Sequence, residues 1–507
     1  MKEEQLKKAD LHSSSIVFKD EILLNDNRIN TLTEIGKKNK FDQKKELRPI
    51  AWKIFLEIIP EENNKSLEEW VDIIDSQRKE YKKKLEKIIS IKSIKGYKSI
   101  DPLLINENKS VEDNDRSIIS LINLDLERTH QSIELFQNTK TKKMLSNILF
   151  IYSKENEDIP YGQGMNELIS MLFICLYPYY FSPTDKLKIE KDEIKKCLND
   201  IESYYEDIYY FFHSEDELES DLFFLFKSLM LKGIKNLYGK DDIKKDDINY
   251  TLYELFPDII KDNTDDERPT HLNLRSYMIV KEKLKIIDKK LYNHFKNINI
   301  NCNYFLHRWF RCIFTREFDI NEVLCLWDKI FLYEYINKKK YKYPFVYIDF
   351  ICVAMIIRIR YQLIKKDEGD CFTILFHYPK GESIFEIMDI ADKVCKTLEN
   401  KLNKEVYDLN EIFDLIKVNN DLIDEDNNSE DANANEELII SPHTYNQNKN
   451  KSLIDCDKKK ENIIFCGKYY IKKKYLFIII LGVAILLLGI FIWIYNNNNN
   501  NIQLDNK

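Results

Sequence analysis

A short loop that runs directly into an apolar helix most restricts how this chain can fold. Pro160 ends whatever helix precedes it, because it cannot donate a backbone hydrogen bond and clashes with the turn before it. Gly162 and Gly164 then flank Gln163 and permit close approaches that a side chain would block. Six apolar residues follow at the spacing of a buried helix face: Met165, Leu168, Ile169, Leu172, Phe173 and Leu176. The sequence therefore predicts a buried helix, ended by Pro178, behind a loop that presents the Gln163 amide to another molecule.

The composition favours helices throughout the folded part of the chain. Only 11 glycines and 11 prolines occur in 507 residues, which argues against a sheet-rich fold, and many stretches are rich in Leu, Ile, Lys and Glu. We therefore predict an all-α fold. The formal net charge of -8 gives no support to nucleic-acid binding. The ten cysteines show no zinc-ligand spacing, so we expect no metal site and interpret most of them as buried apolar residues in a reducing compartment.

The segment from residue 118 to residue 129 is a second helical signal, and it carries two opposite charges. Asp125 and Arg128 lie three residues apart, which makes them neighbours on a helix surface, where they could pair. An ordinary ion pair at the protein surface is the alternative interpretation.

Three other segments have the pattern of buried helices. Pro49 suits the first turn of a helix in which Trp52 lies on the buried face. Asp319 or Asn321 is placed to cap the start of another strongly apolar helix. Residues 350–357 are apolar all round but too short to span a bilayer, so we predict a core helix there.

We predict one helical domain at residues 44–418, with polar segments before, within and after it. The N-terminal extension, residues 1–43, is polar and mixed, and we expect it to be disordered or partly helical. Residues 181–220 have the character of a lid of charged and aromatic residues. Two inserts are not explained by the core pattern: a charged one near 60–115, in which 65–95 suits a partly exposed helix, and an acidic one near 241–269. After the domain, the composition of residues 419–474 predicts a disordered linker with a basic end.

The stretch Tyr475–Tyr495 contains no charged residue and predicts a transmembrane helix. Its 21 residues, at about 1.5 Å each, span about 31 Å, which matches a hydrocarbon core of about 30 Å. Seven lysines lie between Lys458 and Lys474 and only Lys507 follows the stretch, so the positive-inside rule places the helical domain in the cytosol. With residues 496–507 as a short Asn-rich tail, we expect a tail-anchored protein. The tail lacks a basic cluster, which favours endoplasmic reticulum or Golgi membranes over the mitochondrial outer membrane.

Several of these signals occur in an order that resembles a known family. The three main ones are Arg48-x-x-x-Trp52, Ile122-x-x-Asp125-x-x-Arg128 and Tyr161-x-Gln163-Gly164. They resemble the signature motifs of TBC domains, the Rab GTPase-activating proteins. The later segments Phe305-x-x-x-Trp309-Phe310, Glu317-Phe318 and Asn321–Phe331, with Trp327-Asp328 inside the last, are similar to later helices of the same family. The resemblance covers about residues 44–400.

The resemblance implies an all-helical domain that docks on a GTP-loaded Rab and supplies two catalytic side chains to it. Carried over to this sequence, Arg128 is the arginine finger and Gln163 the glutamine finger. Asp125, by its helical offset, is the expected group to hold Arg128 in place, and Tyr161 and Gly164 are expected to shape the loop.

Four further motif residues are assigned to structure and not to chemistry. They are Arg48, Trp52, Trp327 and Asp328.

The same resemblance sets the expected partner and leaves two functions open. The sequence has no Gly-x-x-x-x-Gly-Lys-Ser/Thr motif, so we expect GTP and magnesium to be carried by the partner GTPase and no cofactor to belong to this chain. The chain is then an activator of Rab GTPases in vesicle trafficking and not a hydrolase on its own. A non-catalytic Rab-binding or tethering scaffold on the same membrane is the alternative, and a helical scaffold unrelated to small GTPases is a third.

Overall fold

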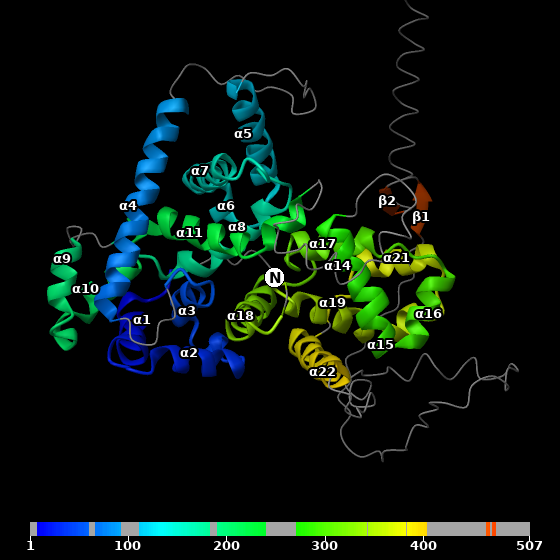
Figure 1. The fold of residues 1–507 in the computed structure, drawn as a ribbon. Coiled ribbons are helices and arrows are strands. Elements are labelled where there is room, and N and C mark those ends of the chain that lie inside the picture. The colour runs from blue at the N-terminus through cyan, green and yellow to red at the C-terminus, as the bar shows by residue number, and fades with distance from the viewer. Residues whose placement is uncertain are drawn as a thin grey trace, which may run out of the picture. The chain divides into compact units, whose positions relative to one another are not determined.

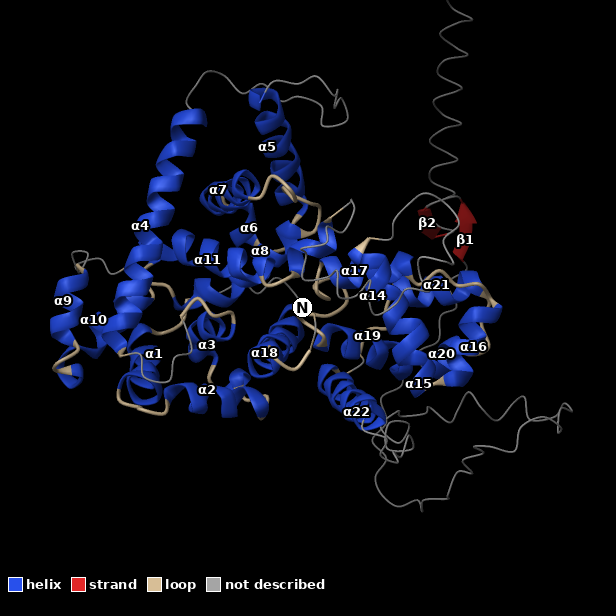
Figure 2. Ribbon diagram, viewed as in Figure 1, coloured by secondary structure: helices blue, strands red, loops and turns tan. Residues whose placement is uncertain are grey.

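The computed structural model describes most of the predicted helical domain. The described residues are 8–59, 66–92, 111–182, 190–239, 270–341, 343–381, 383–402, 463–466 and 469–472. The chain divides into two compact units, Met1–Leu422 and Ile423–Lys507. In the first unit the described residues form helices and the loops between them (Figure 2), which confirms the all-α prediction for that unit.

The helices of the first unit fall into two sets along the chain (Figure 1). The set before residue 240 is α1 (Leu11–Phe18), η1 (Lys19–Leu23), α2 (Arg28–Lys37), η2 (Phe41–Gln43), η3 (Lys45–Leu47), α3 (Arg48–Phe55), α4 (Leu67–Lys92), α5 (Val111–Arg128), α6 (Glu134–Gln137), α7 (Thr139–Glu155), α8 (Met165–Leu176), η4 (Tyr177–Tyr179), α9 (Lys191–Cys197), α10 (Ile201–Phe212), η5 (Glu215–Glu217), α11 (Leu218–Leu231) and η6 (Ile234–Tyr238). The set after residue 269 is α14 (His271–Tyr277), η7 (Met278–Leu284), α15 (Lys285–Ile287), α16 (Lys289–Asn297), α17 (Asn303–Arg311), α18 (Ile320–Asn337), α19 (Tyr347–Arg358), α20 (Arg360–Leu363), α21 (Glu368–Phe376) and α22 (Ile384–Leu402). Here η1 and η7 are π-helices, and the other η elements are 3-10 helices.

In the second unit the structure describes one pair of strands. Strand β1 (Ile463–Cys466) pairs with β2 (Tyr469–Lys472) in antiparallel register, with Ile463 opposite Lys472. This pair lies inside the segment 419–474, for which the sequence predicted no regular structure.

Helix α8 is buried along its whole length, as the apolar pattern predicts. All of its residues from Met165 to Leu176 are shielded from solvent, and each large apolar side chain that is buried in this way contributes roughly 1.5–3 kcal/mol. The helix ends before Pro178, which lies in η4. The predicted core helix at 350–357 is also confirmed, as part of the buried α19.

Helix α18 lies near the middle of the first unit in Figure 1, where it contacts α2 and α3 on one side and α19 and α22 on the other. Its start is fixed by a capping box. The Asp319 side chain accepts from a first-turn backbone amide, and Glu322 accepts from the Asp319 amide at 3.0 Å. Of the two predicted caps, Asp319 is therefore the one that is used.

A buried ion pair joins α3 to α18. Arg48 donates to both carboxylate oxygens of Asp328, from Nε at 2.9 Å and from Nη2 at 2.8 Å. The Trp52 indole donates to the same carboxylate at 2.8 Å, and its ring lies 5.8 Å from that of Trp327. All four motif residues that were assigned to structure thus meet in the core.

Replacing Asp328 with alanine is expected to destabilise the fold by about 3–5 kcal/mol, because it removes the buried carboxylate that both Arg48 and Trp52 bond and leaves the Arg48 guanidinium with only the more exposed Asp42, at 3.2 Å. Denaturant unfolding of the two proteins measures the difference. The matched control is Glu34→Ala, which removes an exposed carboxylate that pairs with Lys37 and Lys38. It is expected to change the free energy of unfolding very little. Equal stability of Asp328→Ala and the parent chain would contradict a role for this pair in holding α3 to α18.

Within the charged stretch near 60–115, the part that the structure describes as α4 contributes to the core. Trp70 is buried, and Arg78 donates to both oxygens of Asp221 on α11 at 2.9 and 2.8 Å. Lys53 and the Tyr180 hydroxyl donate to the same carboxylate at 2.8 and 2.7 Å. Burial alone raises the pKa of Asp221, but Arg78 and Lys53 outweigh burial and hold that pKa well below its usual range. The partly exposed helix predicted at 65–95 is confirmed, but its spacing did not reveal that the buried groups include a charge, Arg78, whose partner lies on a distant helix.

The N-terminal extension forms helices over residues 11–23 and 28–37 and packs against the domain. Phe18, Ile22 and Leu32 are buried, with the Phe18 ring 5.3 Å from that of Tyr209 on α10. Helix α1 contacts α10, and α2 contacts α18. Of the two expectations for this segment, disordered or partly helical, the structure has the helical one.

The segment 181–220 is part of the core where the structure describes it, and not a lid. The side chains of Tyr209 and Phe212 on α10 are fully buried. The Phe181 amide donates to the His213 carbonyl at 2.9 Å, which ties the start of the segment to its end. The prediction was wrong because the polar residues of α10 lie on its outer face, while its inner face carries buried aromatic residues.

Three predicted segments lie outside the described residues: the acidic insert at 241–269, the stretch 475–495 and the tail 496–507. The same holds for 419–462 in the linker. Among the helices that the structure describes, none is long and apolar enough to cross a membrane.

Candidate functional site

Helix α5 carries Arg128 at its C-terminal end and presents it to solvent. Ile119, Ile122 and Leu126 are buried, and the helix packs against α7 and α8. Arg128 is exposed on the other side, in the last turn, where a cation interacts favourably with the helix dipole. Among the described residues Arg128 has no hydrogen-bond or ion-pair partner. Its guanidinium is therefore available to another molecule.

The loop between α7 and α8 presents Gln163 in the same way. Gly164 caps the start of α8 with a φ of 107°, in the left-handed region that favours glycine. Gln163 is exposed, and within the described part of the chain its amide makes no hydrogen bond. The outward-facing amide predicted from the sequence is thus where the structure places it.

A hydrogen-bond network joins the end of α5 to the start of α8. The Tyr161 hydroxyl donates to Asp125 Oδ2 at 2.7 Å. Asn166 donates through Nδ2 to Thr129 Oγ1 at 2.8 Å, and its Oδ1 accepts from the Gly164 amide at 3.1 Å. Thr129 Oγ1 donates in turn to the Asp125 carbonyl at 2.8 Å. The network fixes, relative to each other, the two segments that present the exposed arginine and glutamine.

Asp125 does not pair with Arg128, so both sequence interpretations of this pair, a holding contact and a surface ion pair, are wrong. The Asp125 side chain is buried and takes the Tyr161 hydroxyl instead. Burial, assisted by the Asp125 carboxylate, raises the pKa of Tyr161 far above its usual value, so this hydroxyl stays protonated and donates. A three-residue spacing makes two side chains neighbours on a helix, but it does not say which of them faces inward.

Sequence reasoning missed Thr129 and Asn166, which complete the network. Their hydrogen bond joins residues 37 positions apart, and no local pattern reveals such a pair. Asn166 had one detectable signal, because it is one of the few polar residues in a mainly apolar helix and buried polar groups need partners.

A second arginine lies beside the network but is already paired. Arg316 Nη2 lies 3.0 Å from Glu167 Oε1, and Glu167 Oε2 lies 3.8 Å from His130 Nε2. Burial lowers the pKa of His130 against the opposing pull of Glu167, so the ring is neutral at neutral pH. Of the two arginines at this surface, Arg128 is the one whose charge is uncompensated among the described residues.

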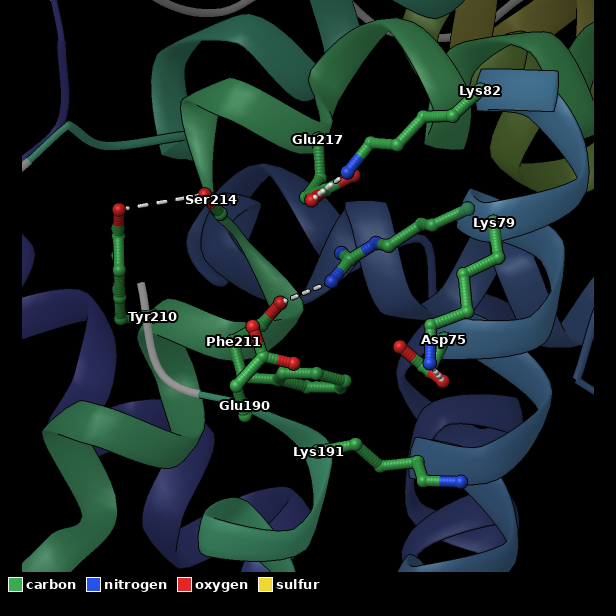
Figure 3. A pocket seen from close by; sticks show the side chains of 10 residues that line it. Asp75, Lys79, Lys82, Glu190, Lys191, Tyr210, Phe211, Ser214 and Glu217 are labelled. Carbon is green, nitrogen blue, oxygen red and sulfur yellow. Dashed lines mark hydrogen bonds and ion pairs between the residues drawn. The ribbon is translucent and has the colours of Figure 1, made fainter. Parts of the chain in front are cut away.

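A cavity of about 220 Å³ lies elsewhere, between α4 and the segments that carry α9, α10 and η5 (Figure 3). Its lysines have partners: Lys82 lies 2.5 Å from Glu217, and Lys79 lies 2.8 Å from Asp75. Lys191, which also lines it, lies 3.2 Å from Asp72, and Arg78 pairs with Asp221, so the described lining residues offer no uncompensated cation to a ligand. Neither exposed finger candidate lines the cavity. No described group of three or more His, Cys, Asp or Glu side chains is placed to hold a metal ion.

Comparisons with known proteins point to one family. A model of the Rab-GTPase-TBC domain (RabGAP-TBC) matches residues 45–266 and 250–364. TBC1 domain family member 5 of Homo sapiens is 26% identical over 370 residues, covering 71% of this chain and 42% of that protein. The GTPase-activating protein GYP1 of Saccharomyces cerevisiae is 25% identical over 284 residues, covering 55% of this chain and 34% of that protein. The chain thus matches less than half the length of these curated relatives.

A solved structure has a similar fold. The crystal structure of the Ypt/Rab-GAP domain of Gyp1p superposes with a TM-score of 0.51 at 20% identity, covering 78% of this chain and all of that one.

Proposed function

Because the chain belongs to the Rab-GTPase-TBC domain family, we propose that it is a GTPase-activating protein that accelerates GTP hydrolysis by a membrane-bound Rab small GTPase and so regulates vesicle trafficking. One observation carries the proposal beyond the family. Arg128 and Gln163 are exposed and free of partners among the described residues, while the backbone segments that bear them are joined by buried hydrogen bonds. GTP and Mg²⁺ would be carried by the GTPase.

Arg128 suits the charge that develops during phosphoryl transfer. In the transition state, negative charge spreads over the phosphoryl oxygens, and a guanidinium meets it with a planar fork of fixed positive donors. A side chain without an internal ion pair delivers its full charge to a partner. Arg128 meets that condition, whereas Arg316 is held by Glu167.

Gln163 suits the orientation of the attacking water. Its amide oxygen can accept from the water and its amide nitrogen can donate towards phosphate, and neither role needs a change of protonation. The loop backbone must hold the amide still, because the side chain itself has no partner among the described residues. Tyr161 and Gly164 would do this through their hydrogen bonds to Asp125 and Asn166.

Phosphate release from a panel of GTP-loaded Rab GTPases tests the proposal. Adding the full chain in detergent micelles is expected to accelerate hydrolysis by at least one member by on the order of 10³-fold or more. A member that binds the chain tightly without acceleration would point to the non-catalytic tether instead. No binding and no acceleration across the panel would contradict both.

We further propose that residues 475–495 anchor the domain to the cytosolic face of an internal membrane, endoplasmic reticulum or Golgi. The support is the sequence alone: an uncharged apolar stretch preceded by lysines. An anchor would place the domain on the surface to which a lipidated GTPase is confined, which raises their effective concentration.

Protease protection of a tag fused after Lys507 tests this topology on sealed membranes. The tag is expected to survive while the helical domain is digested. A tag that is digested together with the domain would contradict the span.

A further inference from the structure

The ring of Tyr238 lies directly against the loop that carries Gln163. Tyr238 ends η6, 75 positions along the chain from Gln163. A Cβ atom added to Gly162 would lie 2.7 Å from Tyr238 Cδ1 and 3.5 Å from its Cγ and Cε1. Because real Cβ atoms do not approach other heavy atoms that closely, the ring occupies the space that a side chain at position 162 would need.

The hydroxyl of the same tyrosine lies beside the second glycine of the loop. A Cβ on Gly164 would lie 3.3 Å from the Tyr238 hydroxyl oxygen and 3.6 Å from the Arg311 carbonyl. The hydroxyl donates to that carbonyl at 2.5 Å. One side chain therefore occupies the space beside both of the glycines that flank Gln163.

Contacts with the end of α17 fix the Tyr238 side chain, so moving the ring away from the loop would break buried interactions. Tyr238 is 7% exposed, its hydroxyl is fixed to the end of α17, and Arg311 Nε donates back to the Leu237 carbonyl at 3.2 Å. Burial raises the pKa of Tyr238 well above its usual value, so the hydroxyl remains a donor. These contacts make η6 and the end of α17 a rigid support for the loop.

We propose that Tyr238 is a positioning residue for Gln163: its ring and hydroxyl form the support against which the Gly162–Gly164 backbone is pressed, and so set where the glutamine amide meets a bound GTPase. The proposal rests on the function proposed above. It also explains the glycine at position 162, which must be small to admit the ring, whereas position 164 requires glycine for its φ of 107°.

The geometry supplies a sharp test, because Gly162 is not in the left-handed region of backbone angles. Alanine is therefore acceptable at position 162 except for its clash with Tyr238. Gly162→Ala is expected to lower kcat for GTP hydrolysis by at least about tenfold with little change in KM, since small displacements of a reacting group are costly. In a Tyr238→Ala background, which is itself slow, the same change is expected to alter kcat by less than about twofold.

Thermal unfolding of the same four full-length proteins gives a readout that does not depend on activity. Gly162→Ala is expected to lower the unfolding midpoint of the parent chain but not that of the Tyr238→Ala variant. Gly369→Ala, at a position with room for a Cβ atom, is the control for the glycine-to-alanine change and should leave kcat unaltered. Gly164→Ala should be harmful in both backgrounds, because its strain comes from φ.

The outcomes separate this proposal from the function on which it rests. Additive effects on both kcat and the unfolding midpoint would overturn the contact and the proposal. Coupling in the unfolding midpoint with additive effects on kcat would overturn the positioning role alone. A parent chain that activates no GTPase would refute the proposed function and with it the catalytic role, while the unfolding cycle would still decide whether Tyr238 supports the loop.

Discussion

Replacing Arg128 with alanine is expected to lower the accelerated rate of GTP hydrolysis by about 10³-fold or more, with the fold intact. The size follows from the charge that an arginine finger supplies to the phosphoryl oxygens. The intact fold follows from the structure, because Arg128 is exposed and has no partner among the described residues, and such surface substitutions alter stability by within about 0.5 kcal/mol. Single-turnover phosphate release measures the rate, and thermal unfolding measures the stability.

Two further variants sharpen this result. Arg128→Lys keeps the charge but loses the planar fork, so it is expected to recover only a small part of the rate. Lys143→Ala removes an exposed cation from the neighbouring α7 and should leave the rate nearly unchanged, which controls for the general electrostatics of this surface. A parental rate in Arg128→Ala would contradict the assignment of the finger.

Replacing Gln163 with alanine is expected to lower the same rate by about 10²-fold or more, since it removes one preorganised hydrogen-bonding group from the transition state. The unfolding midpoint is again expected to stay near that of the parent, because the amide makes no hydrogen bond within the described chain. Gln163→Glu is the matched variant: it keeps the shape and one acceptor but loses the amide donor, and it adds a negative charge facing phosphate. It should therefore be at least as slow as the alanine variant.

The double variant tests whether the two side chains act as a unit. If Arg128 and Gln163 serve one transition state, losing both is expected to cost less than the product of the single losses. A Gln163→Ala protein with the parental rate, measured beside an inactive Arg128→Ala protein, would show that only the arginine is supplied by this chain.

Local pattern was enough to predict the elements that carry the site. The apolar spacing after Gly164 predicted α8, and the polar residue before the glycine predicted an outward amide at Gln163. The cap at Asp319 and the core helix at 350–357 were predicted for the same reason. In each case the signal lies within one helix and its flanking residues, where sequence spacing and spatial position coincide.

The supports of the site could not be predicted, because each is a contact between distant parts of the chain. Thr129 meets Asn166 across 37 positions, and Tyr238 meets the Arg311 carbonyl across 73. Asp125 shows that sequence proximity can also mislead. Its spacing predicted Arg128 as its partner, but in the fold it accepts a hydrogen bond from Tyr161 instead. Residues that are distant in sequence but pack against the loop that carries Gln163 have no local sequence pattern. Only the tertiary structure reveals them.

The ion pair between α3 and α18 has a consequence for how the protein is made. Arg48 and Asp328 are 280 positions apart, so a ribosome adding about 5–20 residues per second completes the partner of Arg48 roughly 14–56 s after Arg48 itself. During that interval Arg48 has the exposed side of its ion pair, Asp42, but lacks the buried Asp328 carboxylate, and α3 lacks the indole of Trp327 to pack against. The face of α3 that packs on α18 is therefore expected to stay exposed during synthesis. The core of the domain can be completed only after α18 has been synthesised.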